Sequence, residues 1–228
     1  MALHIKDSAV TYSPTRITKE SNFYTPFPSN EQVTFNEKQL LPLGLLSTTK
    51  LAQDDKDNIL IAMPISMAIF DGDVPYIVYS LTDHGWQVDA SYLESLSDDF
   101  ESYGEYYQKA ASFYKKHTFL NMSLNEAEDG EPLFEFGGQP ELGCNWDAYL
   151  WDEESDDETR YFDAIDEESG DNYDHYASRE IGFFDEQSGV DFSYLGTFSF
   201  SIYVDGGGEG IVFYSAKHKK VLIIAEFS

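Results

Sequence analysis

The side chains that most often bind metals are present, but they are not spaced as in a known metal site. The histidines are scattered along the chain, at His4, His84, His117, His175 and His218. No two of them form the H-E-x-x-H pattern, in which both histidines share one helix face. An acidic run begins at Asp152, but a calcium loop would need glycine where Asp157 stands and glutamate where Asp163 stands. The sequence therefore predicts no metal site and no cofactor.

Nucleophilic residues do not define a catalytic site either. The G-x-S-x-G turn that exposes a serine in hydrolases does not occur. Cys144 precedes Asn145, and a cysteine hydrolase could be drawn with the distant His175, but a lone cysteine near a tryptophan is more often a packed residue. The glycines at 206–208 lack the G-K-[ST] of a phosphate-binding loop and indicate a hairpin turn. We therefore expect a protein without catalytic residues.

Charge is the strongest feature of the composition. The chain has 42 Asp and Glu against 14 Lys and Arg, which gives a formal net charge of −28. Such a field repels nucleic acids and anionic membranes, and it favours a basic protein partner, cations or high solubility alone. We expect the one basic run, residues 217–220, to protect a sheet edge.

Three features of the sequence indicate a soluble cytoplasmic protein. Cys144 is the only cysteine, so no disulfide can form within the chain. The first ten residues do not combine a basic run with an apolar core, so we expect no signal peptide. No apolar run approaches the roughly 20 residues that a membrane-spanning helix needs.

Hydrophobic periodicity predicts a β-hairpin in the first half of the chain. Residues 59–70 alternate with period two, and residues 71–73 (Asp-Gly-Asp) supply turn chemistry. Residues 74–81 are predicted to return as the second strand.

The last third of the chain is also predicted to be sheet. Residues 195–204 and 211–215 form strands on either side of the glycine-rich turn 205–210. Residues 221–227 are apolar at successive positions, which predicts a strand buried on both faces.

One long amphipathic helix is predicted over residues 91–117. Ser91 and Glu94 form a capping box at its start. Apolar residues follow at steps of three and four, namely Leu93, Leu96, Phe100, Tyr103, Tyr107, Ala110 and Tyr114. We expect this stripe to pack on the sheet.

The first residues are predicted to form a polar N-terminal arm over residues 1–35. Short strands are expected around residues 9–12 and 32–35. Residues 40–46 are apolar but contain Pro42 and Gly44, so they form either a short strand or a turn.

An acidic segment with embedded aromatic residues covers residues 152–175. Aromatic anchors surrounded by charge are the arrangement that fast and tight protein inhibitors use. We therefore predict a partner-binding surface made of Trp151, Asp156, Asp157, Glu158, Tyr161, Phe162 and Tyr173. The open alternatives are a solvated loop that serves solubility and a weak cation site at Asp166, Glu168 and Asp171.

The residues at 134–140, Phe-Glu-Phe-Gly-Gly-Gln-Pro, carry a family resemblance. They resemble the GG-x-P signature of the YwqG-like bacterial family, a domain of unknown function with a mostly β, α+β fold. The pattern of the last strands, at 198–203, 210–214 and 221–226, is similar too, so the resemblance covers roughly the second half of the chain. The chain departs from the family at residues 141–143, because the usual Trp-Leu/Ile-Gln does not follow the proline, and the final glutamine is missing.

The resemblance implies a pocket at this loop, built from Phe136, Gly137, Gly138, Gln139, Pro140 and Trp146. The residue types also permit a purely structural role. Glycines allow positive φ or close approach of the backbone, and proline fixes the direction of exit.

These patterns predict one domain over residues 1–228, of α+β class, predominantly antiparallel β-sheet with one long amphipathic helix packed on it. We expect a non-catalytic acidic binding protein, a cytoplasmic immunity protein or inhibitor that neutralises a bacterial toxin, a basic protein, by direct binding. The alternative is a YwqG-like module that binds a small molecule or a peptide. An enzyme ranks last, because no catalytic set can be identified.

Overall fold

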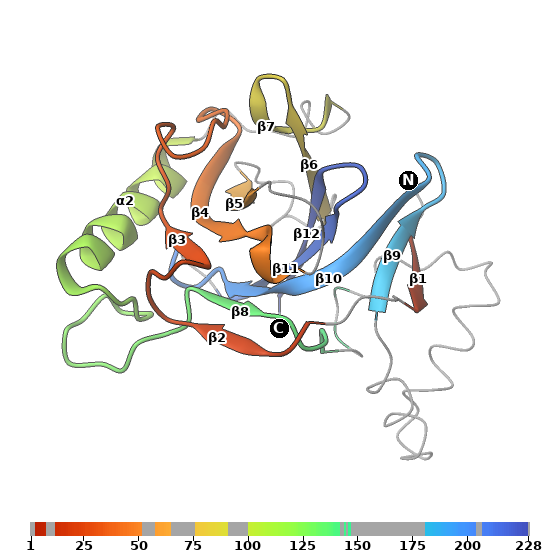
Figure 1. Ribbon diagram of the computed structural model, residues 1–228. Helices are drawn as coiled ribbons and strands as arrows, with labels where there is room; N and C mark the ends of the chain where they lie inside the picture. The colour runs from red at the N-terminus through yellow and green to blue at the C-terminus, as the bar shows by residue number, and fades with distance from the viewer. Residues whose placement is uncertain are drawn as a thin grey trace, which may run out of the picture.

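The computed structural model places the chain in a mostly antiparallel β fold with an α-helix on one side (Figure 1). The structure describes residues 3–7, 12–51, 58–64, 76–90, 100–141, 144, 146, 181–203 and 207–227. The predicted α+β class, with antiparallel sheet as its main component, is confirmed.

The larger sheet has nine strands among the described residues, and seven of them form one path in the order β1-β9-β10-β11-β12-β6-β7. These strands are β1 (Leu3–Asp7), β9 (Ile181–Asp185), β10 (Val190–Ser199), β11 (Glu209–Ser215), β12 (Lys220–Glu226), β6 (Tyr76–Thr82) and β7 (Gly85–Val88). The other two, β2 (Thr15–Ile17) and β8 (Phe134–Phe136), join the sheet because β8 pairs with both β2 and β10.

Strand β10 organises this part of the fold, because two other strands share one of its edges. Its first residues pair with β9, from Val190 opposite Asp185 to Ser193 opposite Gly182. Its later residues pair with β8, with Thr197 opposite Glu135. The other edge of β10 pairs with β11 along most of its length.

A smaller sheet of three strands, in the order β3-β4-β5, packs beside the larger one (Figure 1). Its strands are β3 (Tyr24–Pro26), β4 (Leu40–Ser47) and β5 (Asn58–Pro64). The register of β4 shifts between Pro42 and Gly44, so residues 40–46 are a strand with a bulge rather than a turn. Gly44 is required there, because a Cβ atom would overlap the ring of Tyr24.

The predicted hairpin of residues 59–70 and 74–81 is wrong. β5 pairs with β4, whereas β6 pairs with β12 and β7, so the two strands lie in different sheets. Residues 59–63 are all buried, which shows that β5 is covered on both faces and is not a half-exposed hairpin strand. β12 is also buried on both faces and takes β6 and β11 as its two neighbours. Residues 65–75, including the expected turn, lie outside the described residues.

The C-terminal prediction is confirmed for β11 and β12 and is partly wrong for β10. β10 begins at Val190 and ends at Ser199, so it starts five residues before the predicted position 195 and stops earlier. The basic residues 217–220 lie at the β11–β12 hairpin, not along a free edge. The Lys220 ammonium there contacts the Asp89 carboxylate at 2.5 Å.

The strands of the N-terminal arm lie in other places than predicted. β1, β2 and β3 are its strands, because β9, β8 and β4 offer them edges to pair with. Phe35 forms only an isolated bridge with Trp86, and residues 8–11 lie outside the described residues.

Helix α2 spans Phe100–His117 (18 residues) and covers the described part of the helix predicted over 91–117, while residues 91–99 lie outside the described residues. Tyr107 and Ala110 are buried, whereas Glu105 and Lys109 are exposed. The Tyr107 hydroxyl donates a hydrogen bond to the Pro42 carbonyl of β4 at 3.0 Å. The described part of the helix therefore packs against the smaller sheet. No helix of the described chain is both long and apolar enough to cross a membrane.

Candidate functional site

The double-glycine loop after β8 joins three segments of the chain. The Gly137 N–H donates to the Leu195 carbonyl of β10 at 2.8 Å, and the Gly138 N–H donates to the Tyr12 carbonyl at 2.9 Å. Both glycines have positive φ, 73° and 75°. A Cβ atom on Gly137 would lie 2.7 Å from the carbonyl oxygens of Tyr12 and Ser13. Both N–H groups are used inside the fold, so the glycines serve as a structural junction.

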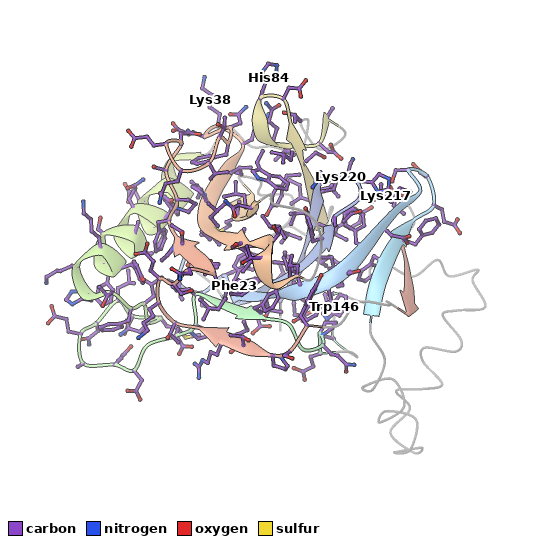
Figure 2. All side chains as sticks on the ribbon, in the orientation of Figure 1. Phe23, Lys38, His84, Trp146, Lys217 and Lys220 are labelled. Atoms are coloured by element: carbon purple, nitrogen blue, oxygen red, sulfur yellow. The ribbon has the colours of Figure 1, made fainter. Side chains whose placement is uncertain are left out.

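The two aromatic residues predicted for the pocket belong to the core. Phe136 is 4% exposed and packs on the ring of Phe23, with ring centroids 4.9 Å apart. Trp146 is fully buried and lies within the fold (Figure 2). Its ring packs against Phe183 and Phe213 at 5.9 and 6.2 Å. Both rings are therefore part of the core, and each residue also lines one of the two cavities beside the loop.

Two adjoining cavities lie beside this loop. The larger, about 660 Å³, is lined by Phe136, Gly137, Gly138 and Gln139 of the predicted set, while the smaller, about 540 Å³, is lined by Trp146. Pro140 is buried and lines neither of them. Glu141, Thr197 and Glu209 line both cavities, so the two cavities lie next to each other.

Four carboxylates line these two adjoining cavities, which together we call the acidic groove. They are Glu135, Glu141, Glu209 and Glu226. Glu209 and Glu226 are direct partners across β11 and β12, so their side chains leave the same face of the sheet. Like charges directly opposite each other destabilise a sheet. The groove therefore concentrates negative charge at an energetic cost to the fold.

The electrostatics of the acidic groove are clearest at Glu209. Partial burial against the sheet, followed by the negative charges of Glu135, Glu141 and Glu226, raises the pKa of Glu209 above its ordinary value. Repulsion among the carboxylates thus disfavours the ionised form of Glu209. A cation placed among them would remove that repulsion.

Glu226 is held by a hydrogen bond, whereas Arg16 lies near two carboxylates. The Glu226 carboxylate accepts a hydrogen bond from the Trp146 backbone N–H at 2.6 Å, which fixes it at the end of β12. Arg16, on β2, is the one cation among the residues that line the two cavities. Its guanidinium lies 3.8 Å from both the Glu131 and the Glu135 carboxylates.

The described residues that line the groove do not include a histidine or form a metal-binding group. Cys144 is half-buried and lines the smaller cavity, but no histidine lines either cavity. His175 lies outside the described residues. Within the described ranges, no three His, Cys, Asp or Glu side chains are placed to hold a metal ion.

The predicted partner-binding residues cannot be placed, since all of them lie outside the described residues. They are Trp151, Asp156, Asp157, Glu158, Tyr161, Phe162 and Tyr173. The alternative cation site at Asp166, Glu168 and Asp171 lies outside as well.

The carboxylates of the acidic groove were not singled out in the sequence, although a signal for two of them exists. Positions that face each other across the β11–β12 hairpin follow from its turn. Ser215 pairs with Lys220, so counting six residues back and six forward places Glu209 opposite Glu226. The positions of Glu135 and Glu141 depend on the approach of β8 to β10, which no local pattern indicates.

A third cavity, of about 1100 Å³, lies between α2 and residues 123–126. Its lining residues include Lys109, Lys116 and one carboxylate, Glu126, which pairs with Lys116 at 3.0 Å. It is therefore a weaker candidate than the acidic groove, where carboxylates outnumber cations.

No family model matches the chain, and no curated protein or solved structure matches it either.

Proposed function

We propose that this chain is a non-catalytic acidic binding protein that captures a basic protein partner. Its role is that of a cytoplasmic immunity protein, which neutralises a toxin by direct binding. The acidic groove is the observation that carries this proposal. Four carboxylates meet there with Arg16 as the one cation among the lining residues.

The energetics of the groove favour a cationic ligand. Bringing Glu209 and Glu226 together costs stability. The pKa of Glu209 is raised first by burial and then by the negative charges of Glu135, Glu141 and Glu226. A lysine or arginine side chain of a partner would offset that cost in the complex but not in the free protein. Binding energy would then come from the relief of repulsion as well as from new contacts.

The charge of the whole chain adds to this effect during association. A net charge of −28 attracts basic proteins and speeds their encounter. Salt screens such steering over about 8 Å at physiological ionic strength. The aromatic and acidic residues predicted at 151–173 remain part of the proposal as further contacts with the partner.

The proposal is tested by capturing the partner and measuring its binding kinetics. The tagged chain would be used for a pull-down from its native host, and rate constants would then be measured at low and high salt. We expect association to slow steeply as salt rises, while dissociation changes less. Glu135→Gln and Glu209→Gln should weaken binding, whereas Glu105→Gln, the same charge change on the exposed side of α2, should have little effect. The proposal would be overturned by a partner whose binding does not depend on salt and is unchanged by Glu135→Gln and Glu209→Gln.

A second candidate function rests on the larger cavity. About 660 Å³ of space lies beside the double-glycine loop, enough for a small molecule or a short peptide. This is the function expected for a YwqG-like module, to which the chain has a resemblance at residues 134–140. A ligand of this kind would raise the melting temperature of the protein without an equally strong dependence on salt.

A further inference from the structure

We infer that Arg16 is a built-in competitor of the partner, because it occupies the place in the acidic groove where a basic side chain of the partner would bind. This inference rests on the proposed function. Arg16 on β2 pairs across the strands with Glu135 on β8, and Glu135 pairs with Thr197 on β10. Directly paired residues project from the same face of a sheet. All three side chains line the larger cavity, so the guanidinium belongs to the groove itself.

The contacts of Arg16 are those of a cation that is held loosely. Its Nη2 lies 3.8 Å from Glu131 Oε2, and its Nε lies 3.8 Å from Glu135 Oε1. Charged hydrogen bonds between nitrogen and oxygen measure about 2.7–2.9 Å, so both separations are longer than a direct bond. The Arg16 side chain is also 60% exposed. An exposed pair of this kind contributes little to stability, and a partner's cation can displace it.

The ordinary interpretation of Arg16 is that it stabilises the pairing of β2 with β8. A cross-strand pair of opposite charges does support a sheet. The two interpretations predict different effects on cation binding when the charge of Arg16 is removed. If Arg16 is purely structural, its replacement should leave cation binding unchanged or make it weaker. If Arg16 is a competitor, its replacement should make cation binding stronger.

The test uses a fluorescein-labelled hexaarginine peptide and fluorescence anisotropy at low salt. Arg16→Gln should bind the peptide about threefold more tightly than the wild type, the size set by one exposed ion pair. The matched control is Lys19→Gln, which removes the same charge from an exposed residue that lines neither cavity. It should change the affinity much less, because it acts only through the general field. Arg16→Lys keeps a cation in the groove and should bind like the wild type.

The outcomes separate this inference from the proposed function. If Arg16→Gln binds the peptide more tightly than Lys19→Gln does, and Glu209→Gln binds it more weakly than the wild type, both the inference on Arg16 and the proposed function are supported. A second outcome is that Glu209→Gln weakens peptide binding but Arg16→Gln binds the peptide no more tightly than Lys19→Gln. In that case Arg16 is not a competitor, and the proposed function stands. If the wild type and all variants fail to bind the peptide, the groove is not a cation site and both are overturned. A melting curve of each variant shows that it is folded.

Discussion

Glu209 and Glu226 are direct neighbours across the antiparallel pair β11–β12, and both line the acidic groove. Like charges at such positions destabilise a sheet. The neighbouring strands add Glu135, and the segment after the double-glycine loop adds Glu141. The predictions below follow from this arrangement and from the residues that hold the groove in place.

The first prediction concerns the pH dependence of stability at Glu209. Its pKa is raised in the folded state, first by burial and then by the other three carboxylates, from an ordinary value of 4.5. The folded chain therefore holds this proton more tightly than the unfolded chain does, and that stability is lost as pH rises through the folded pKa. Glu209→Gln should match the wild type in melting temperature below pH 4.5, and exceed it by a margin that grows above that value and levels off once pH passes the folded pKa. A difference that stays constant with pH would contradict the assignment.

The second prediction concerns the double-glycine loop. Gly137→Ala should lower the free energy of unfolding by about 2–4 kcal/mol, because it combines left-handed backbone strain with a clash against backbone oxygens. Gly189→Ala is the matched control. Its φ is 67°, but a Cβ atom there would have no neighbour within 4 Å, so only the strain of about 1–2 kcal/mol applies. Urea denaturation of both variants measures the difference. Equal losses would mean that the close approach at Gly137 is unimportant.

The third prediction concerns two buried tyrosines. The Tyr24 hydroxyl is buried without a hydrogen-bond partner among the described residues, whereas the Tyr107 hydroxyl donates to the Pro42 carbonyl. Tyr24→Phe should therefore be neutral or stabilising. Tyr107→Phe should cost about 1 kcal/mol, since it leaves a carbonyl without its donor. Thermal or urea unfolding would rank the two variants, and a larger loss for Tyr24→Phe would refute the comparison.

The fourth prediction concerns Cys144 and the enzymatic alternative. The thiol is half-buried at the edge of the smaller cavity, and no histidine lines that cavity. We expect Cys144→Ser to keep the fold and to bind the captured partner with unchanged affinity. Loss of function in a folded Cys144→Ser variant would instead indicate a nucleophilic cysteine.

The sequence predicts the strands whose burial pattern is regular and whose partner is the next strand along the chain. β11 and β12 are examples, because a short turn joins them and their apolar residues are continuous. Prediction from the sequence fails where a strand pairs with a strand that is distant along the chain. The sequences of β5 and β6 indicate a hairpin, but the two strands do not pair with each other. β5 pairs with β4, and β6 pairs with β12. Contacts far apart in sequence decide such pairings, and no local pattern reveals them.

The same limit applies to the site. Gly137 and Gly138 stand out in the sequence because paired glycines permit positive φ, and in the structure both have positive φ. What the loop does could not be predicted, because its partners, Tyr12 and Leu195, are distant in sequence. Glu135 is unremarkable among 42 acidic residues until β8 pairs with β10 and brings it to the groove.

The most direct test of the acidic groove is carboxyl footprinting of the captured complex. The chain would be labelled with a carbodiimide and an amine, alone and with its partner, and each carboxylate would be quantified by mass spectrometry. We expect labelling of Glu135, Glu141 and Glu209, which are exposed in the free chain, to fall when the partner binds, while Glu105 on α2 is labelled equally in both samples. A tight complex in which Glu135, Glu141 and Glu209 are labelled as strongly as in the free chain would contradict the account.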